Sequence, residues 1–184
     1  TIRLVVLDPA GAPVPRAELQ YHYELHGQSG TGDTQADENG RFKQFLDVRA
    51  SYSFLASDPK KRYRPAVAHD VPPGTHDLVL QLGEKSTFRL RVEDDKDRPV
   101  ERFVARVEQT RDHFSANHRS PEDGVLRAGE IELVTPAETF EVTVEAEGFE
   151  VARLGPFEPV TVPGELVARL LVLPGVRGRV TSSD

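Results

Sequence analysis

The chain has 184 residues, including 14 Gly, 14 Pro and no Cys, Met or Trp, and its net charge is −7. Without Cys it cannot form disulfides, use a thiol nucleophile or bind zinc through cysteine, and its acidic balance argues against nucleic acid as a partner. No apolar stretch approaches the roughly 20 residues of a membrane-spanning helix, so we expect no membrane span in this segment.

The first predicted strand, residues 2–8, opens a unit that the chain repeats. It leads into a Gly-Ala-Pro-Val turn, and the similar run at residues 88–94 leads into Asp-Arg-Pro-Val, 86 residues later. A third start follows at residues 176–182. We therefore predict two complete repeats, residues 1–84 and 85–174, and the truncated start of a third at 175–184. Because the chain also lacks Met, we expect it to be a piece cut from a larger protein.

The next predicted strand shows the alternation on which the fold prediction depends. Tyr21, Tyr23 and Leu25 alternate with polar residues, and the run from Phe140 to Glu147 does the same. A period of two residues indicates a strand with one buried face, and no window keeps a helical period. Strands at this spacing predict an all-β fold of two tandem antiparallel Greek-key β-sandwich domains with about seven strands each. The short linker at residues 83–86 predicts close coupling between them.

The polar face of this second strand carries a candidate metal site. His22, Glu24 and His26 are two residues apart, so they are predicted to project from one strand face, where they could bind zinc or nickel. A structural zinc site normally has a fourth ligand. An exposed polar face is therefore the favoured interpretation, and the three residues are kept as candidate metal ligands.

A glycine-rich segment follows at residues 27–32, with the sequence Gly-Gln-Ser-Gly-Thr-Gly. It resembles a phosphate-binding loop in its glycine content, but it lacks the Lys of that motif, and an acidic turn follows where a helix would have to begin. We therefore predict a flexible loop here.

The chain has one basic run, which is the candidate ligand-binding segment. It consists of Lys60, Lys61, Arg62, Tyr63 and Arg64. Clustered positive charge can attract an anionic glycan or an acidic protein partner. A solvated loop is the alternative interpretation, because most runs of charge in soluble proteins are simply exposed.

The spacing of the turn and strand residues in the first repeat resembles the carboxypeptidase regulatory-like domain. The resemblance rests on Asp8 with its Gly-x-Pro-Val turn, the Asp37-x-x-Gly-Arg-Phe segment and the Tyr52-x-Phe-x-Ala strand. It implies a transthyretin-like (prealbumin-like) β-sandwich, in a family whose members are usually non-catalytic modules of secreted or cell-envelope proteins. An extracellular or cell-envelope location, and neighbouring domains of the same parent chain as partners, are expected on this ground alone.

Cna B-type repeats are cousins of this family and often form a Lys–Asn isopeptide crosslink. That crosslink would need a Lys in the first strand and an Asn in the last. The chain has only Asn39 and Asn117, neither in a predicted last strand, and Arg3 and Arg89 stand where the Lys is needed. We therefore expect no crosslink.

The segment from Arg62 to His69 is similar to the Arg-Pro-Ala-His-x-His segment of intradiol ring-cleaving dioxygenases, which hold ferric iron with two Tyr and two His. Here Asp70 and Val71 follow His69 where a second His is required, so the set is incomplete. The sequence thus predicts a non-catalytic module without a cofactor, acting in spacing or presentation. A carbohydrate- or protein-binding module is the first alternative, with a glycan or protein as ligand, and an iron enzyme is the second.

Overall fold

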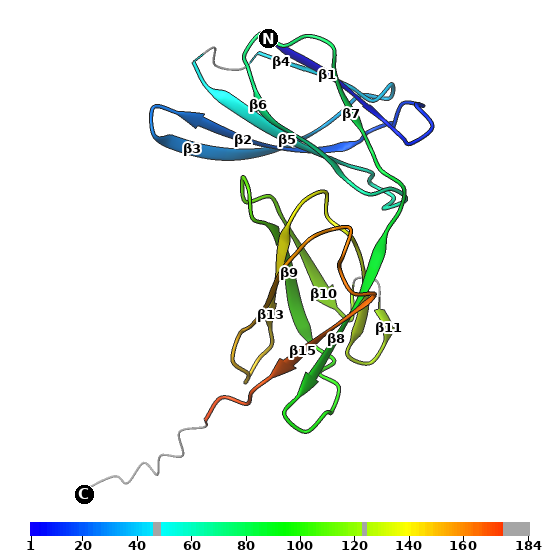
Figure 1. Ribbon diagram of the computed structural model, residues 1–184, viewed down its shortest axis with the longest axis vertical. Coiled ribbons are helices and arrows are strands. Elements are labelled where there is room, and N and C mark those ends of the chain that lie inside the picture. The colour runs from blue at the N-terminus through cyan, green and yellow to red at the C-terminus, as the bar shows by residue number, and fades with distance from the viewer. Residues whose placement is uncertain (46–48, 123–124, 175–184) are drawn as a thin grey trace, which may run out of the picture.

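The computed structural model describes residues 1–45, 49–122 and 125–174, and these residues form fifteen strands and no helix. The strands make four sheets, which pack in pairs into two sandwiches (Figure 1). The predicted all-β fold of two tandem sandwiches is therefore confirmed, with seven strands in the first and eight in the second. The predicted third start at residues 175–184 lies outside the described residues. Among the residues described, no helix could cross a membrane.

The first sandwich packs a three-stranded sheet on a four-stranded one. The small sheet has the order β4-β1-β7, with β1 (Ile2–Leu7), β4 (Arg41–Gln44) and β7 (Leu78–Gln81). The large sheet has the order β3-β2-β5-β6, with β2 (Glu18–Leu25), β3 (Gln28–Gln35), β5 (Ser51–Ser57) and β6 (Ala66–Val71). Alternate residues of each strand point inward, so that Ile2, Leu4, Val6 and Phe54 are buried together.

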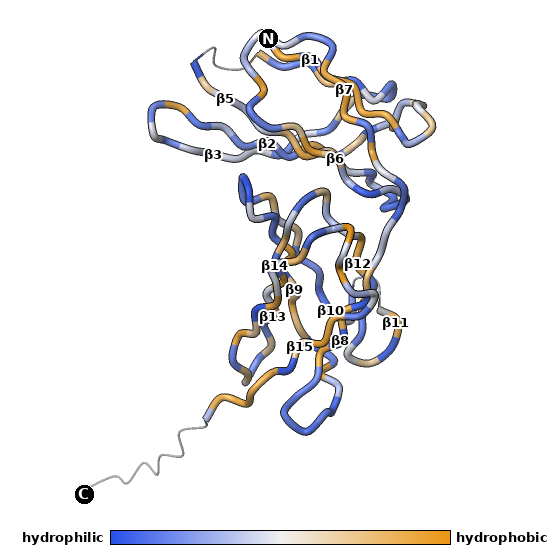
Figure 2. The backbone as a smooth tube through the Cα atoms, viewed as in Figure 1, coloured by the Kyte–Doolittle hydropathy of each residue, from blue (hydrophilic) through white to orange (hydrophobic). Residues whose placement is uncertain are grey.

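The second sandwich repeats this plan with two four-stranded sheets. One has the order β11-β12-β8-β15, with β8 (Thr87–Asp94), β11 (Val125–Arg127), β12 (Glu130–Val134) and β15 (Glu165–Leu170). The other has the order β10-β9-β13-β14, with β9 (Phe103–Gln109), β10 (Ser115–Ser120), β13 (Phe140–Glu145) and β14 (Ala152–Phe157). Phe88 stacks on Phe140 between the sheets, with ring centroids 5.5 Å apart. Apolar residues lie along the strands and the loops are mostly hydrophilic (Figure 2).

The prediction of purely antiparallel sheets is wrong for one pair of strands in each sandwich. β7 runs parallel to β1, with Leu4 opposite Leu78, and β15 runs parallel to β8, with Leu90 opposite Leu166. In both cases the chain reaches the last strand from the opposite sheet, so no hairpin forces the two neighbours to run in opposite directions. The equivalent registers show that the repeat in the sequence is also a repeat in the structure.

The glycine-rich segment at residues 27–32 is not the predicted flexible loop. The chain turns at His26 and Gly27, both with positive φ, and the next residues form the edge strand β3. Tyr23 lies opposite Gly30 and Tyr21 lies opposite Gly32. Each tyrosine ring covers its glycine so closely that a Cβ atom on Gly30 would lie 2.5 Å from the Tyr23 hydroxyl. The neighbouring strand thus supplies the apolar cover that β3 lacks.

Candidate functional site

The two sandwiches meet where the tip of the second faces the outer side of the β3-β2-β5-β6 sheet of the first (Figure 1). We call this contact the joint. The tip consists of the β9–β10 turn and the β12–β13 loop, which reach the sheet from below in Figure 1. The joint brings together titratable side chains from both sandwiches, and it is the candidate functional site.

A row of polar side chains crosses the outer side of this sheet. In β5, Tyr52 and Phe54 point into the core, so the residue between them, Ser53, points outward. His22 on β2 is its register partner. On β6 the register shifts by one residue, because Tyr52 pairs with Val71 but Phe54 pairs with Ala68. This β-bulge leaves both His69 and Asp70 opposite Ser53. The row of outward side chains therefore runs from His22 through Ser53 to His69.

The tip of the second sandwich places two carboxylates on His69. The Nδ1 atom of His69 lies 2.5 Å from Oδ2 of Asp112, and its Nε2 atom lies 2.6 Å from Oε1 of Glu138. Beside them, Arg111 donates a hydrogen bond of 2.6 Å to Asp70. Most of the side-chain surface of His69 is covered, with 13% exposed. Residues that are far apart in the chain thus form one ionic cluster across the joint.

Asp112 is held in its charged form by this environment. Burial opposes ionisation, but hydrogen bonds from Ser53 and His69, together with the nearby charges of His69 and His22, outweigh it and place the pKa of Asp112 below its ordinary value of 3.8. His22 is also covered by the joint, with 13% of its side chain exposed. Its Nδ1 atom is buried and has no hydrogen-bond partner among the described residues.

The linker between the sandwiches is fixed by backbone hydrogen bonds on both sides. Arg64 and Gly83 exchange two backbone hydrogen bonds of 3.0 Å in the first sandwich. Three residues later, the carbonyl of Ser86 accepts a 2.8 Å hydrogen bond from the amide of Thr135 in the second. The predicted close coupling therefore has a physical basis in ordered backbone as well as in the short length of the linker.

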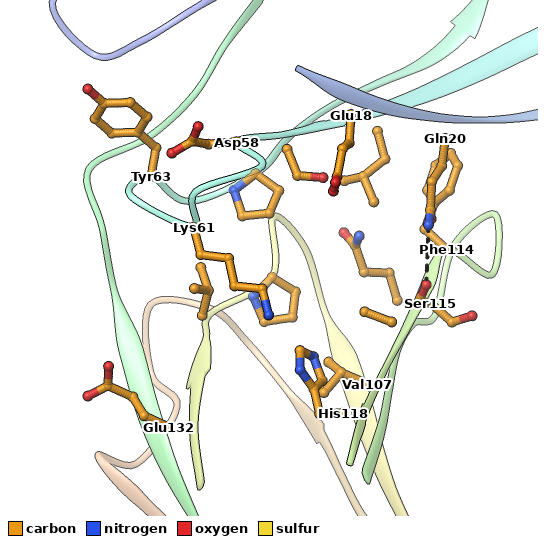
Figure 3. A pocket seen from close by; sticks show the side chains of 17 residues that line it. Glu18, Gln20, Asp58, Lys61, Tyr63, Val107, Phe114, Ser115, His118 and Glu132 are labelled. Atoms are coloured by element: carbon orange, nitrogen blue, oxygen red, sulfur yellow. Dashed lines mark hydrogen bonds between the residues drawn. The ribbon is translucent and has the colours of Figure 1, made fainter. Parts of the chain in front are cut away.

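A cavity of about 200 Å³ lies beside the ionic cluster, between the sandwiches (Figure 3). The first sandwich contributes Leu55, Lys61 and Tyr63 to its wall, and the second contributes Val107 and Phe114. Most of the lining surface is apolar, but polar side chains also line the cavity, including the carboxylates of Glu18, Asp58 and Glu132. At one edge Gln20 donates a 3.4 Å hydrogen bond to the carbonyl of Ser115 (Figure 3).

The basic run at residues 60–64 does not form one continuous positive surface. Arg62 folds back on Asp58, donating from Nε at 2.8 Å and from Nη2 at 3.0 Å. The side chain of Asp58 is fully covered, which opposes its charge, but the hydrogen bonds from Arg62 still hold its pKa below the ordinary value. Lys61 and Tyr63 line the cavity, whereas Lys60 is exposed and does not. The ligand-binding role of the run stays a prediction. Lys61 and Tyr63 are its candidates for contact with a ligand in the cavity.

The three candidate metal ligands are not arranged as expected. β2 ends at Leu25, so His26 lies in the following turn with φ 49° and does not share a strand face with His22 and Glu24. His22 is covered by the joint, and its Nε2 atom lies 4.0 Å from a carboxylate oxygen of the exposed Glu24. Within residues 1–45, 49–122 and 125–174, no group of three His, Asp or Glu side chains is arranged to hold a metal ion. The metal site stays a prediction without support from the geometry.

The iron set of a ring-cleaving dioxygenase is not assembled in the described part of the chain either. Both ring nitrogens of His69 face carboxylates. Tyr52 points into the core on the opposite side of the sheet, and Tyr63 donates a 3.3 Å hydrogen bond to Asp8. Residues 66–69 of the segment that resembles the dioxygenase motif lie in β6, and His69 contacts Asp112 and Glu138 of the second sandwich.

Sequence reasoning did not find the partners of His69. Asp112 lies in a tight turn, where it and His113 have φ of 57° and 53°, and Glu138 precedes β13. The charged Arg-Asp-His sequence of that turn was the available signal, but it does not indicate which sandwich the turn contacts.

No protein-family model matches the chain. No curated protein matches it either. Among solved structures, the chain is similar to the shaft pilin spaA from Lactobacillus rhamnosus GG, with 8% identity over 96% of this chain and 98% of that chain and a TM-score of 0.36. A streptococcal ancillary pilin shows 13% identity over 95% and 62% of the two chains, with a TM-score of 0.36. The Bacillus anthracis TIE protein shows 15% identity over 93% and 33%, with a TM-score of 0.34.

Proposed function

We propose that this chain is a non-catalytic module that holds two β-sandwiches in a fixed relative orientation, as a spacer or presentation segment. The observation that carries the proposal is the joint. The linker is hydrogen-bonded to both sandwiches, and the tip of the second is bound by ion pairs to the sheet of the first. These contacts restrict the relative motion of the two sandwiches, which a long flexible linker would allow. They therefore favour a role that depends on a fixed orientation.

The location and partners of the module belong to the same proposal. The resemblance of the Asp8 and Asp37 turns to the carboxypeptidase regulatory-like domain supports a place in a secreted or cell-envelope protein. The partners would then be neighbouring domains of the same parent chain. A fixed orientation suits this role, because it keeps whatever lies at each end of the module a set distance apart.

The absence of Cys allows a direct test of the fixed orientation. Spin labels attached through Arg3→Cys on β1 and Val167→Cys on β15 report the distance between the sandwiches, and both positions are exposed. We expect a single narrow distance distribution. As a control, a flexible Gly-Ser insertion between Glu84 and Lys85 should broaden it. A native distribution as broad as that of the insertion variant would overturn the proposal.

The cavity favours a second candidate function, a binding module for a glycan or protein ligand. It lies between domains, where ligand sites are common, and the basic run contributes Lys61 and Tyr63 to its wall. An array of neutral and anionic glycans, extended to acidic peptides, tests this function. Binding at the cavity should be lost in Lys61→Ala and kept in Lys60→Ala, whose side chain is exposed away from the cavity. No binding on the array, or equal effects of the two variants, would count against this function.

A further inference from the structure

The contacts of His69 impose a requirement on its protonation. A neutral imidazole has one N–H group and one lone pair, so it donates only one hydrogen bond. Ionised carboxylates accept hydrogen bonds and do not donate them. Because Asp112 lies 2.5 Å from one ring nitrogen and Glu138 lies 2.6 Å from the other, both contacts are hydrogen bonds only when the ring carries two protons. In the neutral ring, one lone pair would face a carboxylate oxygen and repel it.

We propose that His69, Asp112 and Glu138 form a proton-operated clasp that locks the two sandwiches together when His69 is charged and releases them when it is neutral. The proposal rests on the proposed function, because it regulates the same joint. The imidazolium belongs to the first sandwich and both carboxylates belong to the second. Loss of one proton therefore changes an attraction across the joint into a repulsion, without altering either core.

One ion pair beside the clasp crosses the joint without involving His69. Asp70, beside His69 on β6, is paired with Arg111 of the second sandwich, but both side chains are more than half exposed, so this pair contributes little to holding the joint. Arg64, Arg111 and a second carboxylate, Glu158, line the hollow that also contains Glu138. Across the sheet, Ser53 is neutral and donates to Asp112.

His22 is the second histidine near the clasp, and it acts in the same direction. When it is charged, it lowers the pKa of Asp112. Because the ring of His69 makes both hydrogen bonds only in its charged form, the joint should be closed at acid pH and open at alkaline pH. On the acid side, the lowered pKa of Asp112 preserves its charge below the usual range of a carboxylate.

The spin-label pair Arg3→Cys and Val167→Cys, followed from about pH 5 to about pH 9, tests the clasp in the full chain. We expect a narrow distance distribution at the acid end and a broad one at the alkaline end, with a change of about tenfold in the ratio of closed to open molecules. A distribution that is narrow throughout would overturn the clasp and leave the proposed function standing. One that is broad throughout would overturn both.

Variants identify the responsible histidine. His69→Gln should remove most of the pH response, whereas His113→Gln should keep it, because His113 is 75% exposed and contacts only Glu108 of its own sandwich among the described ion pairs. Glu138→Gln should keep the joint closed at alkaline pH, because the amide can donate to the unprotonated Nε2 atom. Tyrosine fluorescence shows whether the first sandwich is folded in each variant. An equal pH response in His69→Gln and native protein would overturn the clasp.

The protonation requirement also has a direct readout. Nitrogen-15 NMR of the imidazole rings should show two ring protons on His69 at acid pH, and the loss of one of them should coincide with the broadening of the distance distribution. A His69 ring that is neutral while the joint is closed would overturn the proposal.

Discussion

Asp94 organises the first turn of the second sandwich with a single carboxylate. Its Oδ1 atom accepts hydrogen bonds from the amides of Lys96 and Arg98, and its Oδ2 atom accepts a 2.7 Å hydrogen bond from Nε of Arg98. Asp8 accepts the same two amide hydrogen bonds in the first repeat, from Ala10 and Ala12. Only the second repeat adds the arginine. The hydrogen bonds of Arg98, first from the side chain and then from the amide, lower the pKa of Asp94 from 3.8 to about 2, although burial opposes this.

This shift predicts how the second sandwich responds to acid. A carboxyl group whose pKa is lower in the folded state stabilises that state above its unfolded value, and the contribution is lost as the pH falls from 3.8 through about 2. Asp94→Asn should therefore lower the free energy of unfolding at neutral pH and flatten its decline in acid. Urea unfolding followed by far-UV circular dichroism measures both effects. Asp95→Asn, at the exposed neighbouring position, is the control, and equal acid slopes in Asp94→Asn and native protein would contradict the prediction.

At the scale of elements, β3 in the β2–β3 hairpin depends on side chains of the neighbouring strand β2 for its packing. The segment after His26 has few apolar residues, and its own pattern predicts a loop. It becomes strand β3 because Tyr21 and Tyr23 of β2 lie across Gly32 and Gly30. Rings that cover cross-strand glycines supply the packing that these residues cannot provide.

We therefore expect that adding one methyl group to a glycine of this hairpin lowers the free energy of unfolding of the first sandwich. Gly32→Ala should displace the Tyr21 ring, because a Cβ atom there overlaps the end of this side chain. We expect a loss of about 1 to 2 kcal/mol in the free energy of unfolding. Gly164→Ala, where a Cβ atom meets nothing within 4 Å, should stay within about 0.5 kcal/mol of native. Urea unfolding followed by tyrosine fluorescence measures the first change and circular dichroism the second. Equal effects of the two variants would show that ring packing does not hold β3.

The row of outward side chains on the first sandwich is not repeated on the second. Glu141 occupies the register position of Ser53, between two inward residues of β13, and its partner on β9 is Glu108, where the first sandwich has His22. The bulge of β14 opposite Glu141 contains Gly155 in place of a histidine. The second sandwich thus has carboxylates in place of Ser53 and His22 and a glycine in place of His69, and so it does not carry a second copy of the clasp.

At the scale of the whole molecule, the two sandwiches have separate cores. The buried cluster around Phe54 and the one around Phe140 share no residue. All four tyrosines of the chain lie in the first sandwich, and there is no Trp. Tyrosine fluorescence therefore reports the unfolding of the first sandwich, whereas circular dichroism reports both.

The separate cores predict independent unfolding. Phe140→Ala removes a ring that is fully buried between Phe88 and Phe157. It should destabilise the second sandwich by about 3 to 5 kcal/mol and leave the tyrosine transition within about 0.5 kcal/mol of native. Phe54→Ala, the matched change in the first core, should move the tyrosine transition instead. If Phe140→Ala moved both transitions equally, the sandwiches would unfold as one cooperative unit.

The sequence by itself determined the all-β class, the repeat of 86 residues and the buried faces of strands such as β1, β8 and β13. These properties follow from local alternation, because a strand with every second residue apolar has one face to bury. The tertiary structure alone decided the parallel direction of β7 and β15, the strand at residues 28–35 and the joint. His69 meets carboxylates 43 and 69 residues away in the chain. Contacts of that kind depend on how two finished sandwiches are oriented, and no local pattern specifies this.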